Sequence, residues 1–370
     1  MKLKLQQYLL PGVVFQSVLI GGAYATGREI VEYGAKFGAA GIWSIVAIGL
    51  GFSLITAVCY EFARVTGAYD YRTLVRRLIG PAWPLFDLLY LLMVVVVIAV
   101  VSAASGAIAE QVLGLPYWAG VALVIALVAT INAAGRGVIE SFKSVGSALL
   151  YVGYVVFAGS VLIGGWPQVR AVLASGDSSF WGEAPFGLVF STGLLYVGYN
   201  LAGLPSTLFV LDRQTSRRQA LWAGVITGAL STVPFLLTWL AILAFYPQPA
   251  VLNAEVPWLV MLGRVGGDGL VAFYAVVILW TLVETSVGMI HAVVDRISVN
   301  RVETGGYALT PRQVAAVTVG LLVTAALLSR WGIIALVARG YSLMAYGFLV
   351  LFAVPLLTRG LAIIRRDAHR

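Results

Sequence analysis

Long apolar runs, separated by short polar breaks, occupy nearly the whole chain. Reading these runs between charged residues, prolines and glycines gives ten candidate helices, each close to the roughly 20 apolar residues that one bilayer crossing needs. They cover residues 12–36, 40–63, 84–110, 116–133, 146–166, 186–210, 219–246, 269–294, 312–329 and 332–357. The pattern predicts an all-α polytopic membrane protein with about ten transmembrane helices, called spans 1 to 10 below.

The composition supports a membrane protein and excludes several classes of function. Hydrophobic residues make up 60% of the chain, charged residues 11%, and the mean hydropathy is +0.94, whereas soluble domains have about 45–50% apolar and about 25% charged residues. Cys59 is the only cysteine, so no internal disulfide or cysteine-clustered metal site is expected. No metalloprotease helix motif, Gly-Lys-Ser/Thr phosphate loop or nucleophile elbow occurs. We therefore expect no enzyme, no ATP-driven pump and no cofactor.

The basic residues are distributed unevenly between the two ends of the predicted spans. With the N-terminus in the cytoplasm, all but six of the 24 Lys and Arg residues fall in cytoplasmic segments, the exceptions being Arg28, Lys36, Arg170, Arg264, Arg330 and Arg339. The positive-inside rule describes this asymmetry, so the net charge of +8 reflects topology and predicts no nucleic-acid partner. We expect a multi-pass protein of the cell's inner (plasma) membrane with both termini cytoplasmic. Its expected partners are the lipid bilayer and a small-molecule solute, and its oligomeric state is left open.

Two stretches in the two halves of the chain resemble each other. Residues 14–24 read VFQSVLIGGAY and residues 189–199 read VFSTGLLYVGY. Span 1 runs outward and span 6 inward, so five spans followed by five of opposite orientation would form an inverted repeat. The predicted division is a first repeat at 1–166, an outer loop at 167–185, and a second repeat at 186–370 with an outer hairpin at 247–268.

Within the stretch LIGGAYATGREIVEYG, span 1 holds three glycines, an arginine and a glutamate in the nine residues 21–29. Glycine tolerates non-helical dihedrals, and unwound backbone persists at membrane depth only where it is buried in protein or lines a watery cavity. Inverted-repeat transporters pair two broken helices near the bilayer midplane. We therefore predict a break from Gly21 to Gly27. The alternative is that span 1 ends near Thr26, with Arg28 and Glu29 at the outer interface.

The candidate solute-binding residues follow from this break and from a matching one in span 6. They are Gly21, Gly22, Ala23, Tyr24, Ala25, Thr26, Gly27 and Arg28 in span 1, Gly198, Tyr199, Asn200 and Gly203 in span 6, and Trp280 in span 8. Side chains such as Tyr199 and Asn200 can bond a polar solute, although such residues also bond between membrane helices. Their chemistry indicates a small molecule with polar groups and some apolar or cationic surface.

Span 8 carries a second cluster of oxygen atoms. Thr285 and Ser286 are adjacent hydroxyls, and the carbonyl of Leu282 lies about one turn earlier. Hard cations take oxygen ligands of this kind, whereas hydroxyls in membrane helices commonly bond to the preceding turn instead. Glu284 is rotated about 100° from Thr285 on a helix, and it is the alternative, proton-coupling carboxylate.

The order of these features resembles the LeuT fold, and GGAYATGREIVEYGAKFG at residues 21–38 resembles the YkvI-like group of bacterial membrane proteins. The resemblance implies a 5+5 inverted repeat, alternating access, and a central site between spans 1, 3, 6 and 8, to which span 3 would contribute Ser105. It also implies a Na+ site formed by Leu19, Gly22, Leu282, Thr285 and Ser286. The ATGRE segment differs from the sequence pattern that sodium symporters of this fold have at the break in span 1. The resemblance therefore does not imply selectivity for amino acids.

Charged residues within membrane spans are costly and usually functional. The resemblance implies an outer gate between spans 1 and 10, which Glu29 and Arg339 would form as an ion pair. Arg28 is then an alternative cation facing the solute, and Lys4 with Asp295 is the candidate inner gate. In the competing interpretation, each charged side chain extends so that its charged group reaches the nearest membrane–water interface.

Together these features predict a secondary active transporter that moves a small polar solute, amino-acid-like or an amine, by Na+-coupled symport. Two alternatives stay open at this level. One is proton-coupled or ion-independent transport that uses Glu284. The other is a membrane sensor that binds the solute without transporting it.

Overall fold

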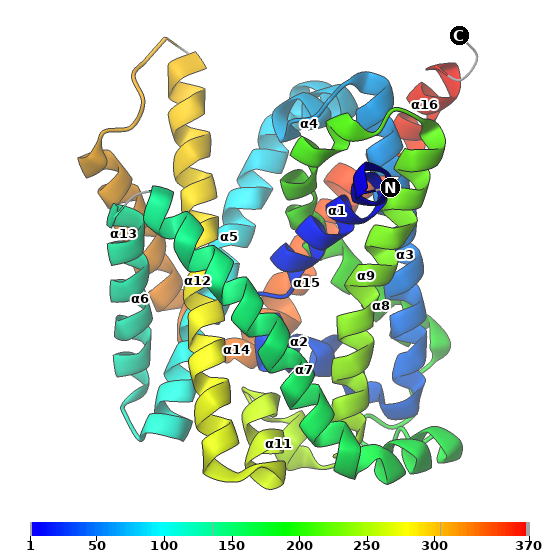
Figure 1. Ribbon diagram of the computed structural model, residues 1–370, viewed down its shortest axis with the longest axis vertical. Coiled ribbons are helices and arrows are strands. Elements are labelled where there is room, and N and C mark those ends of the chain that lie inside the picture. The colour runs from blue at the N-terminus through cyan, green and yellow to red at the C-terminus, as the bar shows by residue number, and fades with distance from the viewer. Residues whose placement is uncertain (1, 135, 304, 368–370) are drawn as a thin grey trace.

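The computed structural model describes residues 2–134, 136–303 and 305–367, without the side chains of residues 2–5, 22–23, 133–151 and 303. Every regular element within these ranges is a helix (Figure 1). Eight helical segments of the described chain are long and apolar enough to cross a bilayer. The interrupted span 1 and α6, with its apolar stretch Tyr117–Asn132, bring the spans to the predicted ten. The all-α membrane fold is confirmed.

The first half of the chain contains spans 1 to 5. Span 1 consists of α1 (Lys2–Leu19), the 3-10 helix η1 (Gly22–Thr26) and α2 (Arg28–Tyr33). The 3-10 helix η2 (Ala35–Gly41) leads into span 2, which is α3 (Ile42–Thr66). The short helices α4 (Tyr71–Ile79) and η3 (Gly80–Ala82) precede span 3, α5 (Trp83–Leu113). Spans 4 and 5 are α6 (Tyr117–Ala134) and α7 (Arg136–Ser175).

The second half contains spans 6 to 10. Span 6 begins as α8 (Phe186–Asn200) and continues as the 3-10 helix η4 (Leu201–Arg213), and span 7 is α9 (Arg217–Leu243). The short helices α10 (Pro249–Leu252) and α11 (Pro257–Val265) occupy the predicted hairpin. Spans 8 and 9 are α12 (Gly267–Glu303) and α13 (Pro311–Ser329). Span 10 runs through α14 (Gly332–Ala335), η5 (Leu336–Tyr341), α15 (Ser342–Phe348), η6 (Leu349–Ala353), η7 (Leu356–Gly360) and α16 (Leu361–Asp367), of which η5, η6 and η7 are π-helical.

Several helices extend beyond the spans predicted from the sequence, among them α7 and α12. α7 continues through Pro167 to Ser175 and takes up the first part of the predicted loop 167–185. α12 continues past residue 294 to Glu303. Hydropathy marks the depth of the hydrocarbon layer, whereas polar residues also support a helix outside it. An apolar run therefore sets a lower limit on the length of such a helix.

Close contact between α3 and α9 holds one side of the bundle. A Cβ atom at Gly224 would lie 2.3 Å from the backbone nitrogen of Ala57, and one at Gly228 would lie 2.4 Å from that of Ser53. Thr56 Oγ1 also donates a hydrogen bond to the carbonyl of Gly224 at 2.7 Å. Small residues and interhelical hydrogen bonds are the usual basis of helix packing in membranes. α1 packs on α9 and α8 packs on α3, so this pair supports both interrupted spans.

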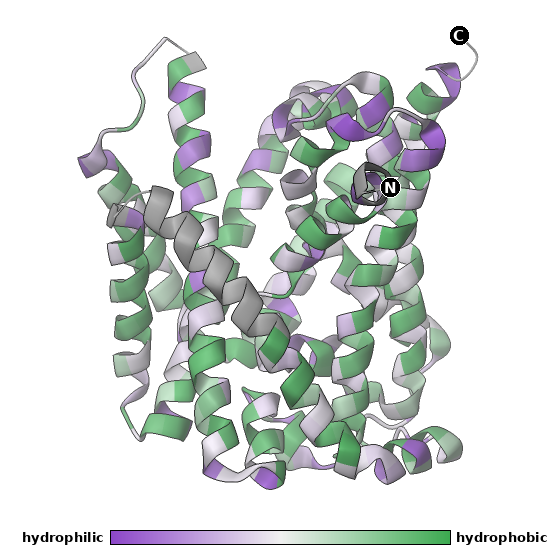
Figure 2. Ribbon diagram, viewed as in Figure 1, coloured by the Kyte–Doolittle hydropathy of each residue, from purple (hydrophilic) through white to green (hydrophobic). Residues whose placement is uncertain are grey.

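The outside of the bundle is apolar along the helices and polar at one end. Val155 is 72% exposed, Ile163 87% and Leu343 65%, which suits contact with lipid rather than water. Figure 2 shows hydrophilic residues gathered around α4 and near both chain termini. This distribution supports a bilayer-embedded protein whose termini lie at the same face.

Candidate functional site

Span 1 is interrupted at the predicted position. α1 ends at Leu19, and α2 begins at Arg28 after one 3-10 segment. Gly21 is extended, whereas Gly27 takes the left-handed conformation with φ 83°, which favours glycine. Arg28 and Glu29 are both buried, with 4% and 5% of their surface exposed. The alternative in which span 1 ends near Thr26 and both charges reach the interface is therefore wrong.

Aromatic side chains from neighbouring spans enclose the unwound segment. The carbonyl of Ala25 accepts a hydrogen bond from the hydroxyl of Tyr274, in α12, at 2.9 Å. The ring of Tyr24 lies against that of Tyr154, in α7. Unwound backbone at membrane depth needs such partners. Tyr24 and Ala25 therefore support the break, and they are not among the described residues that line the cavity below.

The C-terminal end of the break is packed in the same way. A Cβ atom at Gly27 would lie 3.0 Å from the ring of Trp258 in α11. Thr26 is fully buried, and its Oγ1 accepts the backbone N–H of Arg28 at 3.2 Å. Gly22 belongs to the 3-10 turn, while the side chain of Ala23 lies outside the described part of the structure.

Span 6 changes helix type where the sequence predicts a break. α8 ends at Asn200, and the chain continues without a gap as η4. Tyr199, Asn200 and Gly203 line the cavity. Gly198 instead contacts span 10, where a Cβ atom would lie 3.0 Å from the carbonyl oxygen of Ala345. Three of the four predicted residues of span 6 thus lie at the cavity.

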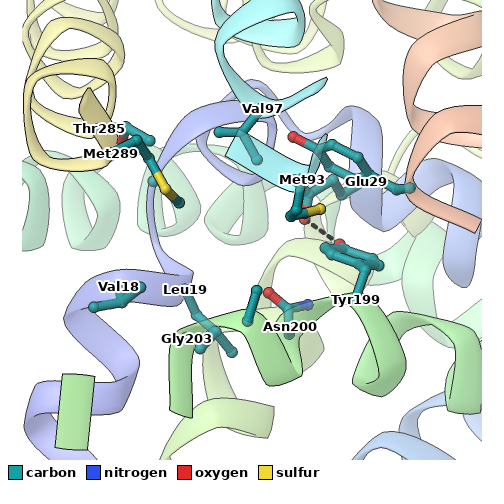
Figure 3. Close-up of a pocket in the computed structure, with 13 residues that line it drawn as sticks. Val18, Leu19, Glu29, Met93, Val97, Tyr199, Asn200, Gly203, Thr285 and Met289 are labelled. Carbon is teal, nitrogen blue, oxygen red and sulfur yellow. Dashed lines mark hydrogen bonds between the residues drawn. The ribbon is translucent and has the colours of Figure 1, made fainter. Parts of the chain in front are cut away.

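One cavity lies between the two interrupted spans (Figure 3). Its empty volume is about 440 Å³, including its open mouth. The lining residues come from α1, the unwound segment, α2, α5, span 6, α12 and η5: Val18, Leu19, Gly21, Glu29, Met93, Val97, Tyr199, Asn200, Ala202, Gly203, Thr285, Met289 and Tyr341. Met93, Val97 and Met289 carry no signal in the sequence, because apolar side chains face both lipid and cavities in a span. The cavity thus lies among spans 1, 3, 6, 8 and 10, which include the four spans of the predicted central site.

Arg28 and Glu29, the two adjacent charged residues of span 1, have exchanged their predicted places. The sequence predicts that Arg28 faces the solute and that Glu29 belongs to the outer gate. Glu29 lines the cavity, and its Oε2 accepts a hydrogen bond from the hydroxyl of Tyr199 at 2.5 Å (Figure 3). Arg28 instead points to the hairpin, where Nη1 donates to the carbonyls of Leu252 at 2.7 Å and Ala254 at 3.2 Å. The predicted solute contact of Arg28 needs correction, because Nη1 bonds to the hairpin, Nη2 lies 3.4 Å from Glu32 Oε2, and Arg28 is not among the described residues that line the cavity.

The predicted outer ion pair is absent from the described residues, and a tyrosine links the same two spans. Glu29 bonds to Tyr199, whereas Arg339 is exposed. The hydroxyl of Tyr33, in α2, donates to the carbonyl of Val337 at 3.1 Å and lies 3.2 Å from Ser342 Oγ. Neutral hydrogen bonds therefore connect spans 1 and 10 in this conformation.

The predicted inner gate is only partly visible. Asp295 Oδ2 lies 3.3 Å from Nε2 of His291, one turn earlier on α12. The side chain of Lys4 lies outside the described residues. The Lys4–Asp295 pairing therefore stays a prediction.

The predicted ion ligands lie beside the break in span 1. Thr285 Oγ1 would lie 2.5 Å from a Cβ atom at Gly21, and the same hydroxyl donates to the carbonyl of Thr281 at 2.9 Å. Ser286 is fully buried, and its hydroxyl has no hydrogen-bond partner among the described residues. Leu19 lines the cavity, and Leu282 is fully buried. A hydroxyl that donates to a carbonyl keeps its lone pairs, so the residues present fit a small cation.

Three further predicted residues lie away from the described cavity lining. Ser105 Oγ donates to the carbonyl of Val101 at 2.7 Å, and the carbonyl of Ser105 packs against Gly120 of α6. Trp280 and Glu284 are half-buried on α12. Their spacing on the helix turns them away from the face that Thr285 presents. The solute contact predicted for Trp280 finds no support in this placement, and the proton-coupling role of Glu284 stays a prediction.

No protein-family model matches the chain. Among curated proteins it is similar to the uncharacterized membrane protein YkvI of Bacillus subtilis (strain 168), with 29% identity over 115 residues. The match covers 31% of this chain and 33% of YkvI, so it spans about a third of that relative's length. It confirms the predicted resemblance to YkvI.

Two solved transporters share the overall architecture. Mhp1, a nucleobase-cation-symport-1 family transporter in a closed conformation with bromovinylhydantoin bound, matches with a TM-score of 0.59 and 14% identity over 95% of this chain and 77% of its own. A Na+-coupled sialic acid symporter in a substrate-bound, outward-open state matches with a TM-score of 0.53 and 13% identity over 96% and 85%. At such identities the likeness concerns the fold alone. The chain therefore has the LeuT fold, as the sequence predicts.

Proposed function

We propose that the chain is a secondary active transporter that couples the movement of Na+ to that of a small polar organic solute by alternating access. The observation that carries the proposal is the cavity bordered by both interrupted spans. Interrupted helices offer carbonyls and N–H groups to ions and solutes at membrane depth, where continuous helices have none to spare. The Na+-coupled sialic acid symporter of the same fold supports this coupling.

The coupling ion would bind between the break in span 1 and α12. Its ligands would be the carbonyls of Leu19 and Gly22, the carbonyl of Leu282, and the hydroxyls of Thr285 and Ser286. The close approach of Gly21 to the Thr285 hydroxyl supports this position. The buried Ser286 hydroxyl supports it too, because a buried polar group without a partner is costly and a bound cation would offset that cost.

The hairpin side of the cavity would be the closed side in this conformation. There Arg28 binds the hairpin carbonyls and Tyr33 binds span 10. Alternating access requires each side to open in turn, so the Tyr33 contacts would break when the cavity opens toward the hairpin. The proposal keeps the predicted repeats, 1–166 and 186–370, and an inner-membrane location with cytoplasmic termini.

Na+ is expected to stabilise the purified protein against thermal unfolding, compared with K+ at equal ionic strength. A ligand present at about 100 times its Kd stabilises the native state by about 2.7 kcal/mol. Thr285→Ala removes one ligand and should weaken the response to Na+ at least about tenfold. Thr324→Ala is the matched control, because its exposed hydroxyl makes the same bond to the preceding turn, on α13. Equal melting in Na+ and K+, or an unchanged response in Thr285→Ala, would show that the ion site is misassigned.

A further inference from the structure

One carboxyl group sets the charge of the cavity. Glu29 is the only charged side chain among the described residues that line it. Tyr199, Tyr341 and Asn200 are neutral and polar, and most of the remaining lining is apolar. An ionised carboxylate in such an apolar enclosure attracts cations strongly, because little water screens it.

Glu29 has no cationic partner within the described part of the chain. Arg28 is directed to the hairpin, and Lys36 forms an ion pair with Glu32. Arg339, the partner expected from the sequence, is exposed and makes no ion pair with Glu29. A buried carboxylate without a counter-charge is unfavourable, so the site is suited to a counter-charge that arrives from outside the chain.

Aromatic rings stand next to this carboxylate. The hydroxyl of Tyr199 donates to Glu29 at 2.5 Å, which fixes the carboxylate at the wall of the cavity. The centroids of the Tyr199 and Tyr341 rings lie 4.7 Å apart, and both residues line the cavity. The faces of tyrosine rings attract cations, including organic ammonium groups. A carboxylate beside two such rings suits an organic cation.

We propose that the solute carries a protonated amine or a quaternary ammonium group, which binds between Glu29 and the rings of Tyr199 and Tyr341. The assignment rests on the proposed function in one respect, namely that this cavity is the solute site. It narrows the expectation drawn from the sequence, an amino-acid-like solute or an amine, to the cationic group of such a solute. It also separates solute recognition by Glu29 from ion binding by Thr285 and Ser286.

A panel of compounds paired by shape and differing in charge tests the proposal by thermal stabilisation of the full-length protein in Na+ buffer. Choline is compared with its neutral isostere 3,3-dimethylbutanol, putrescine with 1,4-butanediol, and tyramine with 4-ethylphenol, and butyrate serves as the anion. At least one amine is expected to stabilise the protein at concentrations at least tenfold below those at which its neutral counterpart does. Stabilisation by the neutral compounds or by butyrate at equal or lower concentrations overturns the proposal.

Glu29→Gln is the decisive variant, because it keeps an acceptor for Tyr199 and removes the charge. It is expected to weaken stabilisation by the amine at least tenfold. The matched control is Glu32→Gln, which removes the same charge three residues away, where the carboxylate pairs with Arg28 and Lys36. An unchanged amine response in Glu29→Gln, or an equal loss in Glu32→Gln, overturns the assignment.

The response to Na+ keeps the two proposals distinguishable. Glu29→Gln should retain the stabilisation by Na+, which also reports that the variant is folded. If Na+ never stabilises the wild-type protein but the amine response depends on Glu29, the ion coupling fails and this assignment holds. If Glu29→Gln loses the Na+ response and keeps the amine response, Glu29 serves the ion and the assignment fails.

Discussion

Replacing Gly21 with valine is expected to abolish the stabilisation of the protein by Na+. Any Cβ atom at this position would lie 2.5 Å from Thr285 Oγ1, well inside contact distance. Gly21 has φ −142° and ψ 177°, an extended conformation that any residue adopts. The effect would therefore come from lost space between the break and α12, where the ion is proposed to bind. Melting temperatures in Na+ and in K+ measure it directly.

The control for Gly21→Val is Gly159→Val in α7, where an added Cβ atom meets nothing within 4 Å. This variant should keep the full Na+ response. The double variant Gly21→Val with Thr285→Ala should regain thermal stability in K+, because the smaller side chain relieves the contact, and still lack the Na+ response. A normal Na+ response in Gly21→Val alone would place the ion elsewhere.

Replacing Arg28 with leucine is expected to release the hairpin from span 1. Arg28 is 4% exposed, and its Nη1 is the donor to the carbonyls of Leu252 and Ala254. Each buried polar group left without a partner costs about 1–3 kcal/mol, so the free energy of unfolding should fall by about 3 kcal/mol. Faster proteolytic cleavage within the hairpin, at residues 253–256, would accompany the loss.

Lys36→Leu is the matched control for Arg28→Leu. Lys36 shares Glu32 with Arg28 and, as described, makes no hydrogen bond to the hairpin. It should therefore change hairpin cleavage little. If Lys36→Leu increased the cleavage as much as Arg28→Leu, the hairpin would be held by the charge network as a whole rather than by the two hydrogen bonds.

The ten spans and the break in span 1 could be predicted because their signals are local. The length of an apolar run reports a bilayer crossing, and Gly21 and Gly27 report a backbone that leaves the helix. The orientation of the neighbouring charges could not be predicted in this way. Arg28 and Glu29 are separated by about 100° around the helix axis, so either could have faced the cavity.

The partners that fixed their orientation lie far away in the chain. Arg28 binds carbonyls more than 220 residues later, and Glu29 binds a tyrosine hydroxyl 170 residues later. Every residue has a carbonyl, so backbone acceptors such as those of Leu252 and Val337 leave no mark in the sequence. For the same reason, the sequence could not predict the hydrogen bond from Tyr33 to the carbonyl of Val337. This bond connects spans 1 and 10 in place of the expected ion pair between Glu29 and Arg339.

Uptake into proteoliposomes tests the proposed transport most directly. The probe is the radiolabelled form of whichever panel compound stabilises the wild-type protein most, whatever its charge. With an inward Na+ gradient the wild-type protein should accumulate this compound above its equilibrium level, and an inward K+ gradient of equal size should give equilibration at most. Equal uptake under both gradients, or binding without any accumulation, would contradict Na+-coupled transport through this cavity.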